Sequence, residues 1–216
     1  MSERAERILG AAGRLLLRFG AGKTTIDDIA REAAVSKGSV YLEFRSKREL
    51  FEALVRWEFR AYLTAVRSRV DDDPEGGRLS RIHWHAIDEL LARPLMRALY
   101  TRDADVLGGM LRRHGAPRYA PRLVLGREFV EHMQRAGLVR PGIDAKALGE
   151  TMAVLSVGLV AAAPVLGGDS PSPASMDMFA AMLTEYAEAP AGPGAVAAGK
   201  QAFADLCREL DEQVAR

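Results

Sequence analysis

The sequence VSKGSVYLEFRSKREL, residues 35–50, decides the fold of the N-terminal part of this chain. Two short runs of helix-forming residues meet at residues 36–38, and Ser46 then opens a new helical pattern. The helix predicted over 37–44 has only about two turns, and isolated helices of that length are marginal in water. Neighbouring helices must therefore hold it by its apolar side chains, which leaves its polar side chains available to a partner.

Helical spacing flanks this stretch on both sides. An apolar stripe over residues 8–19 predicts a first helix, which Gly20 and Gly22 are expected to end. Thr25 followed by Asp28 fits a capping box at the start of a second helix. A long helix with an apolar stripe is predicted to follow the quoted stretch, so three short helices lead into a fourth, long one.

Two helices joined by a tight turn, the second with polar side chains, form a helix-turn-helix, whose second helix enters the DNA major groove. Such a recognition helix needs only a turn or two in the groove, which explains its length. Val40 and Phe44 are predicted to hold it to its neighbours. Lys37 and Ser39 can reach bases or phosphates, and Gly38 lets the backbone approach the DNA closely.

The charge distribution favours a polyanion partner for the first part of the chain only. Residues 1–69 hold 14 Lys and Arg against 9 Asp and Glu, whereas the whole chain has a net charge of +1. The single cysteine, Cys207, excludes an internal disulfide framework and suits a reducing cytoplasm. The charged N-terminus does not resemble a signal peptide, and the apolar stretch 153–166 is too short to cross a bilayer. We therefore expect a cytoplasmic protein with no membrane partner.

The segment TTIDDIAREAAVSKGSVYLEFRSKRELFEAL, residues 24–54, resembles the DNA-binding segment of TetR-family transcriptional regulators. The resemblance covers roughly residues 5–56. It implies an all-α homodimer with a three-helix DNA-binding domain and a divergent C-terminal domain that binds a small effector. Carried onto matching positions, it implies DNA contacts at Thr25, Ser36, Lys37, Gly38, Ser39, Tyr41 and Lys47.

Two positions depart from the pattern of that family. Ala34 stands in the turn where the family often has glycine, so the backbone there must accept a side chain. Leu42 stands where many members have a second aromatic residue or a polar residue that faces the groove. It can remove a phosphate contact or add a contact with a thymine methyl group.

No strand pattern stands out, and DDDPEGG at 71–77 is the first clear break in the helical patterns. The fold class is therefore predicted as all-α. We expect a helix-turn-helix DNA-binding domain at 1–48, a connecting long helix and linker at 49–77, and an effector-binding and dimerisation domain at 78–216. The homodimer interface is predicted over 145–166 and 174–187, with a possible contribution from the last helix, 196–214.

The middle of the chain carries large, soft side chains at helical spacing, of a kind that lines adaptable apolar pockets. They predict a cavity for a small, largely hydrophobic effector whose binding lowers operator affinity, so that the protein acts as a repressor; an activator, or a regulator without a ligand, stays open. The candidate ligand-binding residues are Trp84, Met96, Tyr100, Met110, Phe129, Met133 and Met152.

A protein of another class, a helical enzyme or a small-molecule carrier with an incidental helix-turn-helix, is the alternative. Clustered titratable residues in the C-terminal half would favour it, and the sequence has no such cluster. His83 and His85 are two residues apart, so on a helix they point to different faces and cannot chelate one metal together. We therefore predict no catalytic residues, no metal and no cofactor.

Overall fold

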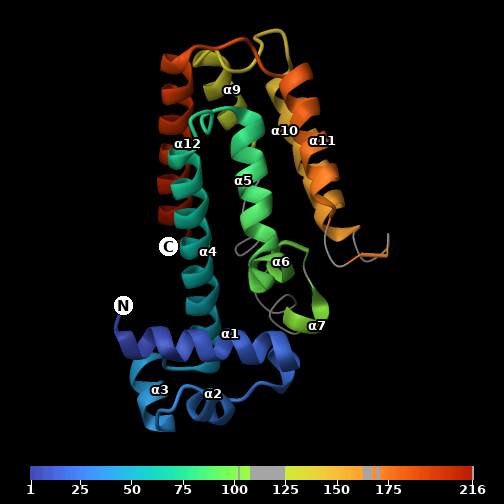
Figure 1. Cartoon of the computed structure of the whole chain (residues 1–216). Helices are drawn as coiled ribbons and strands as arrows, with labels where there is room; N and C mark the ends of the chain where they lie inside the picture. The colour runs from blue at the N-terminus through green and yellow to red at the C-terminus, as the bar shows by residue number, and fades with distance from the viewer. Residues whose placement is uncertain (102, 108–124, 163–166, 169–170, 216) are drawn as a thin grey trace. The chain divides into compact units, whose positions relative to one another are not determined.

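The computed structural model describes residues 1–101, 103–107, 125–162, 167–168 and 171–215. Within these ranges every regular element is a helix, apart from one isolated antiparallel β-bridge between Val139 and Glu188 (Figure 1). The all-α prediction is confirmed. The chain divides into two compact units.

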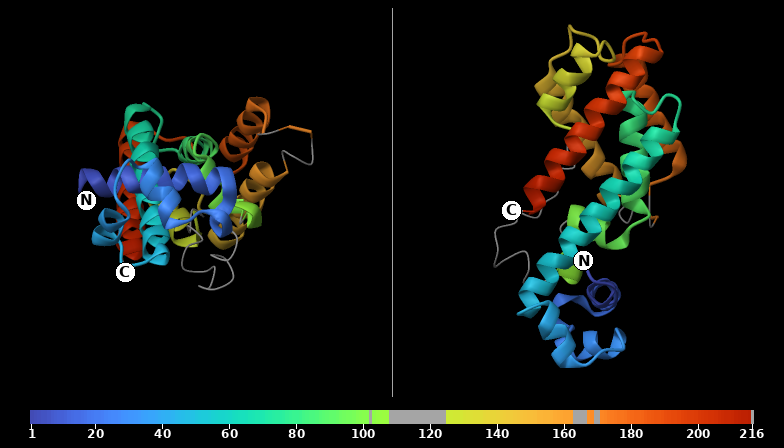
Figure 2. Two further views of the ribbon diagram at one scale, coloured as in Figure 1. Left: turned by 90° about the horizontal axis from the view of Figure 1, so that it is seen from below. Right: turned by 90° about the vertical axis from the view of Figure 1, so that its left-hand side faces the viewer.

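The first unit begins with the three helices that the sequence predicted, of which the second and third are short. Its elements are α1 (Glu3–Lys23), α2 (Ile26–Glu32), α3 (Lys37–Glu43), the first part of α4 (Lys47–Asp72), α6 (Pro94–Thr101) and α7 (Ala104–Leu107). Helices α2 and α3 lie on the same side of α1 (Figures 1 and 2). The fully buried side chains of Ile8, Leu16 and Ile29 form the centre of this unit's core.

The regular helical backbone of α1 is interrupted at Gly20, where the sequence predicted its end, and a short helical segment follows across the kink. Gly20 has φ 75° and ψ 161°, and the helix continues beyond it to Lys23. A Cβ atom at this position would lie 2.4 Å from the carbonyl oxygen of Asp105 in α7. Glycine is required here both for the positive φ and for this close approach.

The turn between α2 and α3 carries the side chain that the sequence placed there. Ala34 has φ 53°, the one non-glycine positive φ among the described residues. The left-handed conformation costs an L-residue about 1–2 kcal/mol. The turn is kept because Val35 N–H donates to Ala30 O at 2.9 Å and directs the chain into α3.

The second unit contains the remainder of α4 and five further described helices. These are α5 (Leu79–Leu91), α9 (Arg127–Arg135), α10 (Ala145–Ala161), α11 (Pro173–Tyr186) and α12 (Pro193–Ala215). Helix α11 packs against α5, and both α10 and α12 pack against α9. Gly199 lets α12 approach the end of the 71–77 segment closely, since a Cβ there would lie 2.2 Å from Gly77 O.

Packing divides the chain at different places from the predicted domain boundaries. Helix α4 is continuous from Lys47 to Asp72, and the two units meet within it, between residues 61 and 62. Residues 94–101, placed in the C-terminal domain from the sequence, pack in the first unit because α6 contacts α1. The division at 1–48, 49–77 and 78–216 stays a prediction about function.

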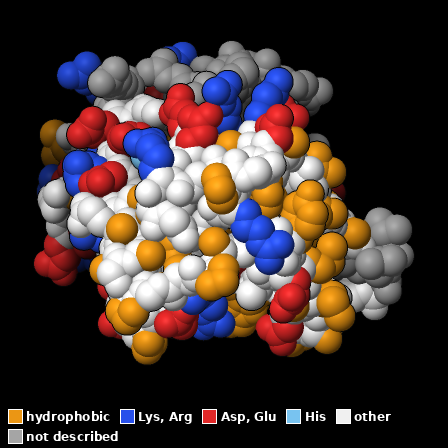
Figure 3. All heavy atoms as spheres, turned by 90° about the horizontal axis from the view of Figure 1, so that it is seen from above, with side chains coloured by type: hydrophobic (Ala, Val, Ile, Leu, Met, Phe, Trp, Pro, Cys, Tyr) orange, Lys and Arg blue, Asp and Glu red, His pale blue; other side chains and the backbone are white. Residues whose placement is uncertain are grey.

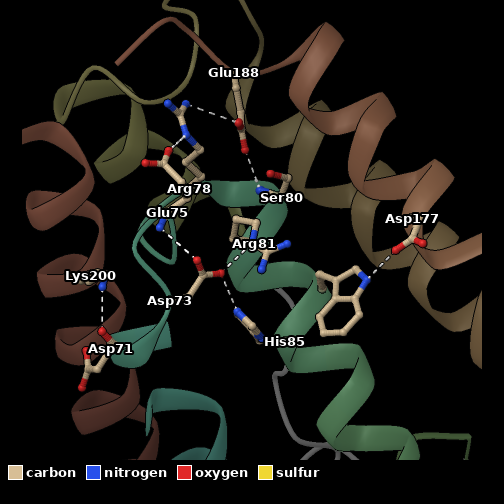
Figure 4. A network of polar contacts seen from close by, with 11 residues as sticks. Asp71, Asp73, Glu75, Arg78, Ser80, Arg81, His85, Asp177, Glu188 and Lys200 are labelled. Atoms are coloured by element: carbon tan, nitrogen blue, oxygen red, sulfur yellow. Dashed lines mark hydrogen bonds and ion pairs between the residues drawn. The ribbon is translucent and has the colours of Figure 1, made fainter. Parts of the chain in front are cut away.

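A polar network holds the start of α5, which has no side-chain cap of its own. The carboxylate of Glu188 accepts the Ser80 backbone N–H at 2.7 Å and lies 3.7 Å from the Arg78 guanidinium (Figure 4). Asp73 accepts hydrogen bonds from Arg81 Nε at 2.6 Å and His85 Nε2 at 2.8 Å. The network therefore joins α5 to the segment before it and to the chain after α11.

His83 lies where α5 meets α10 and α11. Its Nε2 is 2.7 Å from Ser156 Oγ, and its ring packs edge-on against Phe179 with centroids 4.6 Å apart. Because the Ser156 hydroxyl donates to Met152 O at 2.6 Å, it must accept from His83, so Nε2 carries the imidazole proton. Burial lowers the pKa of His83 to about 4.

Replacing His83 by Gln should flatten the acid dependence of stability. Burial lowers the pKa from 6.5 to about 4, so the unfolded chain binds the extra proton first as pH falls. Stability from the neutral ring is present above pH 6.5 and falls by about 3 kcal/mol by pH 4. The free energy of unfolding in urea, measured across this range, checks this.

His132→Gln, which replaces an exposed histidine of α9, is the control. It should leave the profile unchanged. An H83Q profile as steep as that of the natural chain would contradict the assignment.

Ala34→Gly should stabilise the protein by about 0.5–1 kcal/mol. Glycine removes the strain of the left-handed conformation, which raises the free energy of unfolding. Its greater conformational freedom in the unfolded chain offsets part of that increase. Ala33→Gly is the matched control, since Ala33 has an ordinary helical φ of −82°, and it should destabilise. Thermal unfolding of the three proteins tests the assignment, and equal shifts for the two variants would refute it.

Candidate nucleic-acid interface

Helix α3 is capped by the serine that precedes it. Ser36 Oγ accepts the Ser39 backbone N–H at 3.0 Å, as an N-cap residue does. The Ser36 and Ser39 hydroxyls also lie 2.8 Å apart, so each is the other's partner. Only one of the two hydroxyls donates in this contact, so the proton of the other is free to reach a base or a phosphate.

The two faces of α3 differ sharply in burial. Val40 is fully buried, and Phe44, at the C-cap, is 7% exposed. Tyr41 and Leu42 are 47% and 78% exposed, respectively. The predicted anchoring by Val40 and Phe44 is therefore confirmed, and the outer face of α3 stands free of the described part of the chain.

Helix α2 starts with the capping box that the sequence predicted. Thr25 Oγ1 accepts the Asp28 N–H at 3.1 Å, and the Thr25 N–H donates to Asp28 Oδ2 at 3.2 Å. Hydrogen bonds from Thr25, with the nearby Arg31, hold the pKa of Asp28 below its usual value. Thr25 is exposed, so its role as a cap leaves it accessible to a phosphate.

The two lysines of the predicted site already have partners. Lys37 Nζ lies 3.0 Å from Asp27, and this hydrogen bond raises the pKa of the ammonium. Lys47 Nζ donates to Ala21 O at 2.8 Å and lies 5.4 Å from the centre of the Phe51 ring. Partial burial lowers the pKa of Lys47. Lys47 is therefore turned toward the end of α1 in this structure.

Arg45 is a cation that the sequence analysis did not select. It lies in the turn between α3 and α4, its side chain is exposed, and it makes no ion pair within the described residues. Only its backbone is engaged, since the Arg45 N–H donates to Glu49 Oε2 at 2.8 Å. Because Arg45 directly follows the predicted recognition helix, its position in the sequence could have indicated it as a candidate DNA contact.

The other end of α1 fixes the last turn of α3. Arg4 Nη2 lies 2.7 Å from Glu43 Oε1, and the Ser2 hydroxyl donates to the same oxygen at 2.9 Å. Ser2 also caps α1, because its hydroxyl oxygen accepts the Ala5 N–H at 3.0 Å. These contacts orient α3 relative to α1. They also give the Glu43 carboxylate, which lies beside the exposed face of α3, a cationic partner.

The predicted ligand-binding residues are divided between the two units. Met96 and Tyr100 belong to α6 in the first unit, and Met96 is fully buried. Met110 lies outside the described residues. The remaining four belong to the second unit: Trp84, Phe129, Met133 and Met152.

Three of those four side chains are buried on α9 and α10, which pack against each other. They are Phe129 and Met133 of α9 and Met152 of α10. The Phe129 ring meets that of Phe203 edge-on, with centroids 6.3 Å apart. The side chain of Trp84, in α5, points toward α11 instead, because its Nε1 donates a hydrogen bond to Asp177 at 3.1 Å (Figure 4).

The described residues contain no group of three His, Cys, Asp or Glu side chains able to hold a metal ion. Cys207 is buried, and burial raises the pKa of its thiol to about 12, which keeps it protonated and poorly reactive. No helix in the described ranges is long and apolar enough to cross a membrane.

Residues 8–54 match the family model described as bacterial regulatory proteins, tetR family. Among curated proteins, the HTH-type transcriptional regulator YerO of Bacillus subtilis is 46% identical over 50 residues, 23% of this chain and 17% of that protein. The matched relatives are covered over 17% to 44% of their own lengths. The sequence likeness is therefore a likeness of the N-terminal helices.

The fold likeness extends over most of the chain. The fatty acid degradation regulator FadR of Bacillus halodurans has a TM-score of 0.64 at 16% identity, over 85% of this chain and 95% of that one. FadR of Bacillus subtilis in complex with stearoyl-CoA has a TM-score of 0.61 at 14% identity, over 82% and 96%. The N-terminal helices therefore match the tetR family model of bacterial regulatory proteins, and the fold over most of the chain is similar to that of the two FadR structures.

Proposed function

We propose that this protein is a ligand-responsive transcriptional regulator that binds duplex DNA through α2 and α3. The observation that carries the proposal is the outer face of α3, which is exposed and directly follows a tight turn from α2. That is the geometry of a recognition helix in a major groove. A chromosomal target implies a cytoplasmic protein, and no observation favours the alternative of an enzyme or carrier.

The proposed contacts fall into phosphate-binding and base-reading groups. Arg45, Lys37 and Lys47 would bind phosphates, together with the hydroxyls of Thr25 and Tyr41. Lys37 must exchange Asp27 for a phosphate, and exposed ion pairs are worth only about 0–1 kcal/mol, so the exchange costs little. Gly38, Ser39 and Ser36 at the start of α3 would lie nearest the base edges.

The charge of the N-terminal part of the chain supports this assignment. Residues 1–69 carry the excess of Lys and Arg. On the face of the molecule that Figure 3 shows, by contrast, Lys and Arg side chains lie interspersed with Asp and Glu side chains. A polyanion would therefore be attracted more strongly to the N-terminal helices than to that face.

DNA affinity should fall steeply with salt, and Arg45→Ala should weaken binding to every duplex by roughly tenfold for each protomer that contacts the DNA. A charged hydrogen bond contributes about 1.5 kcal/mol, and a lost phosphate contact lowers the slope of log K against log salt by about one per protomer. Fluorescence anisotropy with an operator duplex selected from genomic fragments measures both quantities.

Arg208→Ala is the control for this measurement, because Arg208 is an exposed arginine of α12 in the second unit. It should leave affinity and slope unchanged. Failure of the natural chain to bind any duplex at low salt would refute the proposed function.

We propose further that the DNA-binding form is a homodimer built by α10 and α11. Both helices expose apolar side chains on their outer faces: Val154 and Val157 of α10, and Met178, Met182 and Tyr186 of α11. Val154 is 71% exposed and Met178 63%. Large apolar side chains that recur along a helix face, as Met178, Met182 and Tyr186 do, are buried favourably against a second copy. Two copies would present two α3 helices to a roughly palindromic operator.

The double substitution Val154→Glu with Met178→Glu should convert the dimer into a monomer, because buried carboxylates without partners oppose association. Sedimentation velocity of the full-length chain measures the mass. Leu17→Glu changes an exposed leucine of α1 and should leave the dimer intact. A natural chain that is monomeric at micromolar concentration would contradict the proposed interface.

The effector we propose is a small, largely hydrophobic molecule bound in the C-terminal half, whose binding releases a repressor from its operator. The solved neighbour in complex with stearoyl-CoA supports an apolar ligand, and so does the buried set Phe129, Met133 and Met152. Operator and effector would each lower the other's affinity by the same factor, as linkage between two sites requires.

A further inference from the structure

Leu42 has the most exposed large hydrophobic side chain of the described residues, at 78%. A single exposed leucine is common on protein surfaces and by itself needs no explanation. This one, however, lies on the short helix proposed above to enter the major groove. The inference that follows rests on that proposed function and assigns Leu42 a role within it.

Helical geometry places Leu42 in the middle of the outward face of α3. Successive residues of an α-helix are about 100° apart, so Gly38 and Leu42 point roughly opposite to the buried Val40 and lie one turn apart on the same side. A Cβ atom at Gly38 would meet only Ser36 Oγ, at 3.8 Å, so the surface there is open. The centre of this face therefore consists of a bare backbone and one projecting isobutyl group.

The residues next to Leu42 in the sequence do not point to the centre of this outward face. Tyr41 and Glu43 point to the two flanks of the helix, and Glu43 is held by Arg4 and Ser2. Leu42 has no hydrogen-bonding group, so it cannot bind a phosphate or a base heteroatom. Contact with another apolar group is the favourable interaction open to it in the groove. The apolar feature of the major groove is the C5-methyl group of thymine.

We propose that Leu42 reads a thymine by packing its side chain against the C5-methyl group, once in each half of the operator. Gly38 allows this because the helix backbone can approach the base edges one turn before Leu42. The contact distinguishes thymine from cytosine, whose C5 carries hydrogen. It makes Leu42 a specificity-determining residue rather than a contributor of general affinity.

The test is a methyl scan of the operator with the full-length protein. Each thymine of the selected operator duplex is replaced in turn by deoxyuridine, which keeps every base-pairing group and lacks only the methyl. Affinity is measured by fluorescence anisotropy for the natural chain, for Leu42→Ala and for Leu17→Ala. Leu17 is an exposed leucine of α1 and serves as the matched control.

The natural chain should lose about fourfold in affinity at one thymine of each half-site, the loss expected for one unburied methyl group. Leu17→Ala should show the same loss at the same thymines. Leu42→Ala should be insensitive to deoxyuridine there. It should bind the unmodified operator about as well as the natural chain binds an operator with deoxyuridine at that thymine in both half-sites, because the substitution removes the contact from both protomers.

Two outcomes overturn the proposal while leaving DNA binding intact. One is a scan in which no deoxyuridine weakens the natural chain. The other is a loss at the same thymines that persists undiminished in Leu42→Ala. If the natural chain selects no duplex at all, the proposed function fails, and the role of Leu42 fails with it. Because Leu42 is exposed, its replacement should not change the melting temperature, which confirms that the variant is folded.

Discussion

The burial of Val40 is the contact on which the N-terminal half depends. Seven residues cannot sustain a helix in water, because so few hydrogen bonds do not repay the nucleation of the first turn. Helix α3 persists because Val40 is fully buried against its neighbours, with Phe44 closing the end. The same burial aims the opposite face, with Gly38 and Leu42, outward. Every proposed DNA contact on α3 therefore takes its direction from one apolar side chain.

The polar residues proposed to contact DNA already make hydrogen bonds and ion pairs that stabilise the fold of the first unit. Ser36 and Thr25 cap helices, Lys37 pairs with Asp27, and Lys47 donates to Ala21 O. These partners are exposed or partly exposed and individually weak, so a phosphate can replace them. They keep the unbound surface from presenting unpaired groups and hold the side chains near where DNA would need them.

In the second unit, the buried side chains of His83 and Cys207 carry no charge. The buried His83 is neutral at physiological pH and the thiol of Cys207 stays protonated, both because burial disfavours their charged forms. The polar network around Asp73 and Glu188 joins segments far apart in the chain and stabilises the start of α5. Large apolar side chains are exposed on both α10 and α11, among them Val154 and Met178, as the proposed homodimer interface requires.

The sequence by itself determined the all-α class, the three N-terminal helices, the Thr25 capping box and the anchoring role of Val40. These follow from patterns that act within a few residues, since caps and helical stripes depend on local spacing. Tertiary structure alone decided that Asp105, 85 positions away, approaches Gly20 so closely that no side chain fits there. It likewise decided that Lys47 turns to Ala21 O, that Arg45 makes no ion pair with any residue that the structure describes, and that α6 packs with α1. Periodicity carries no information about such distant partners, because they meet only when separate helices pack.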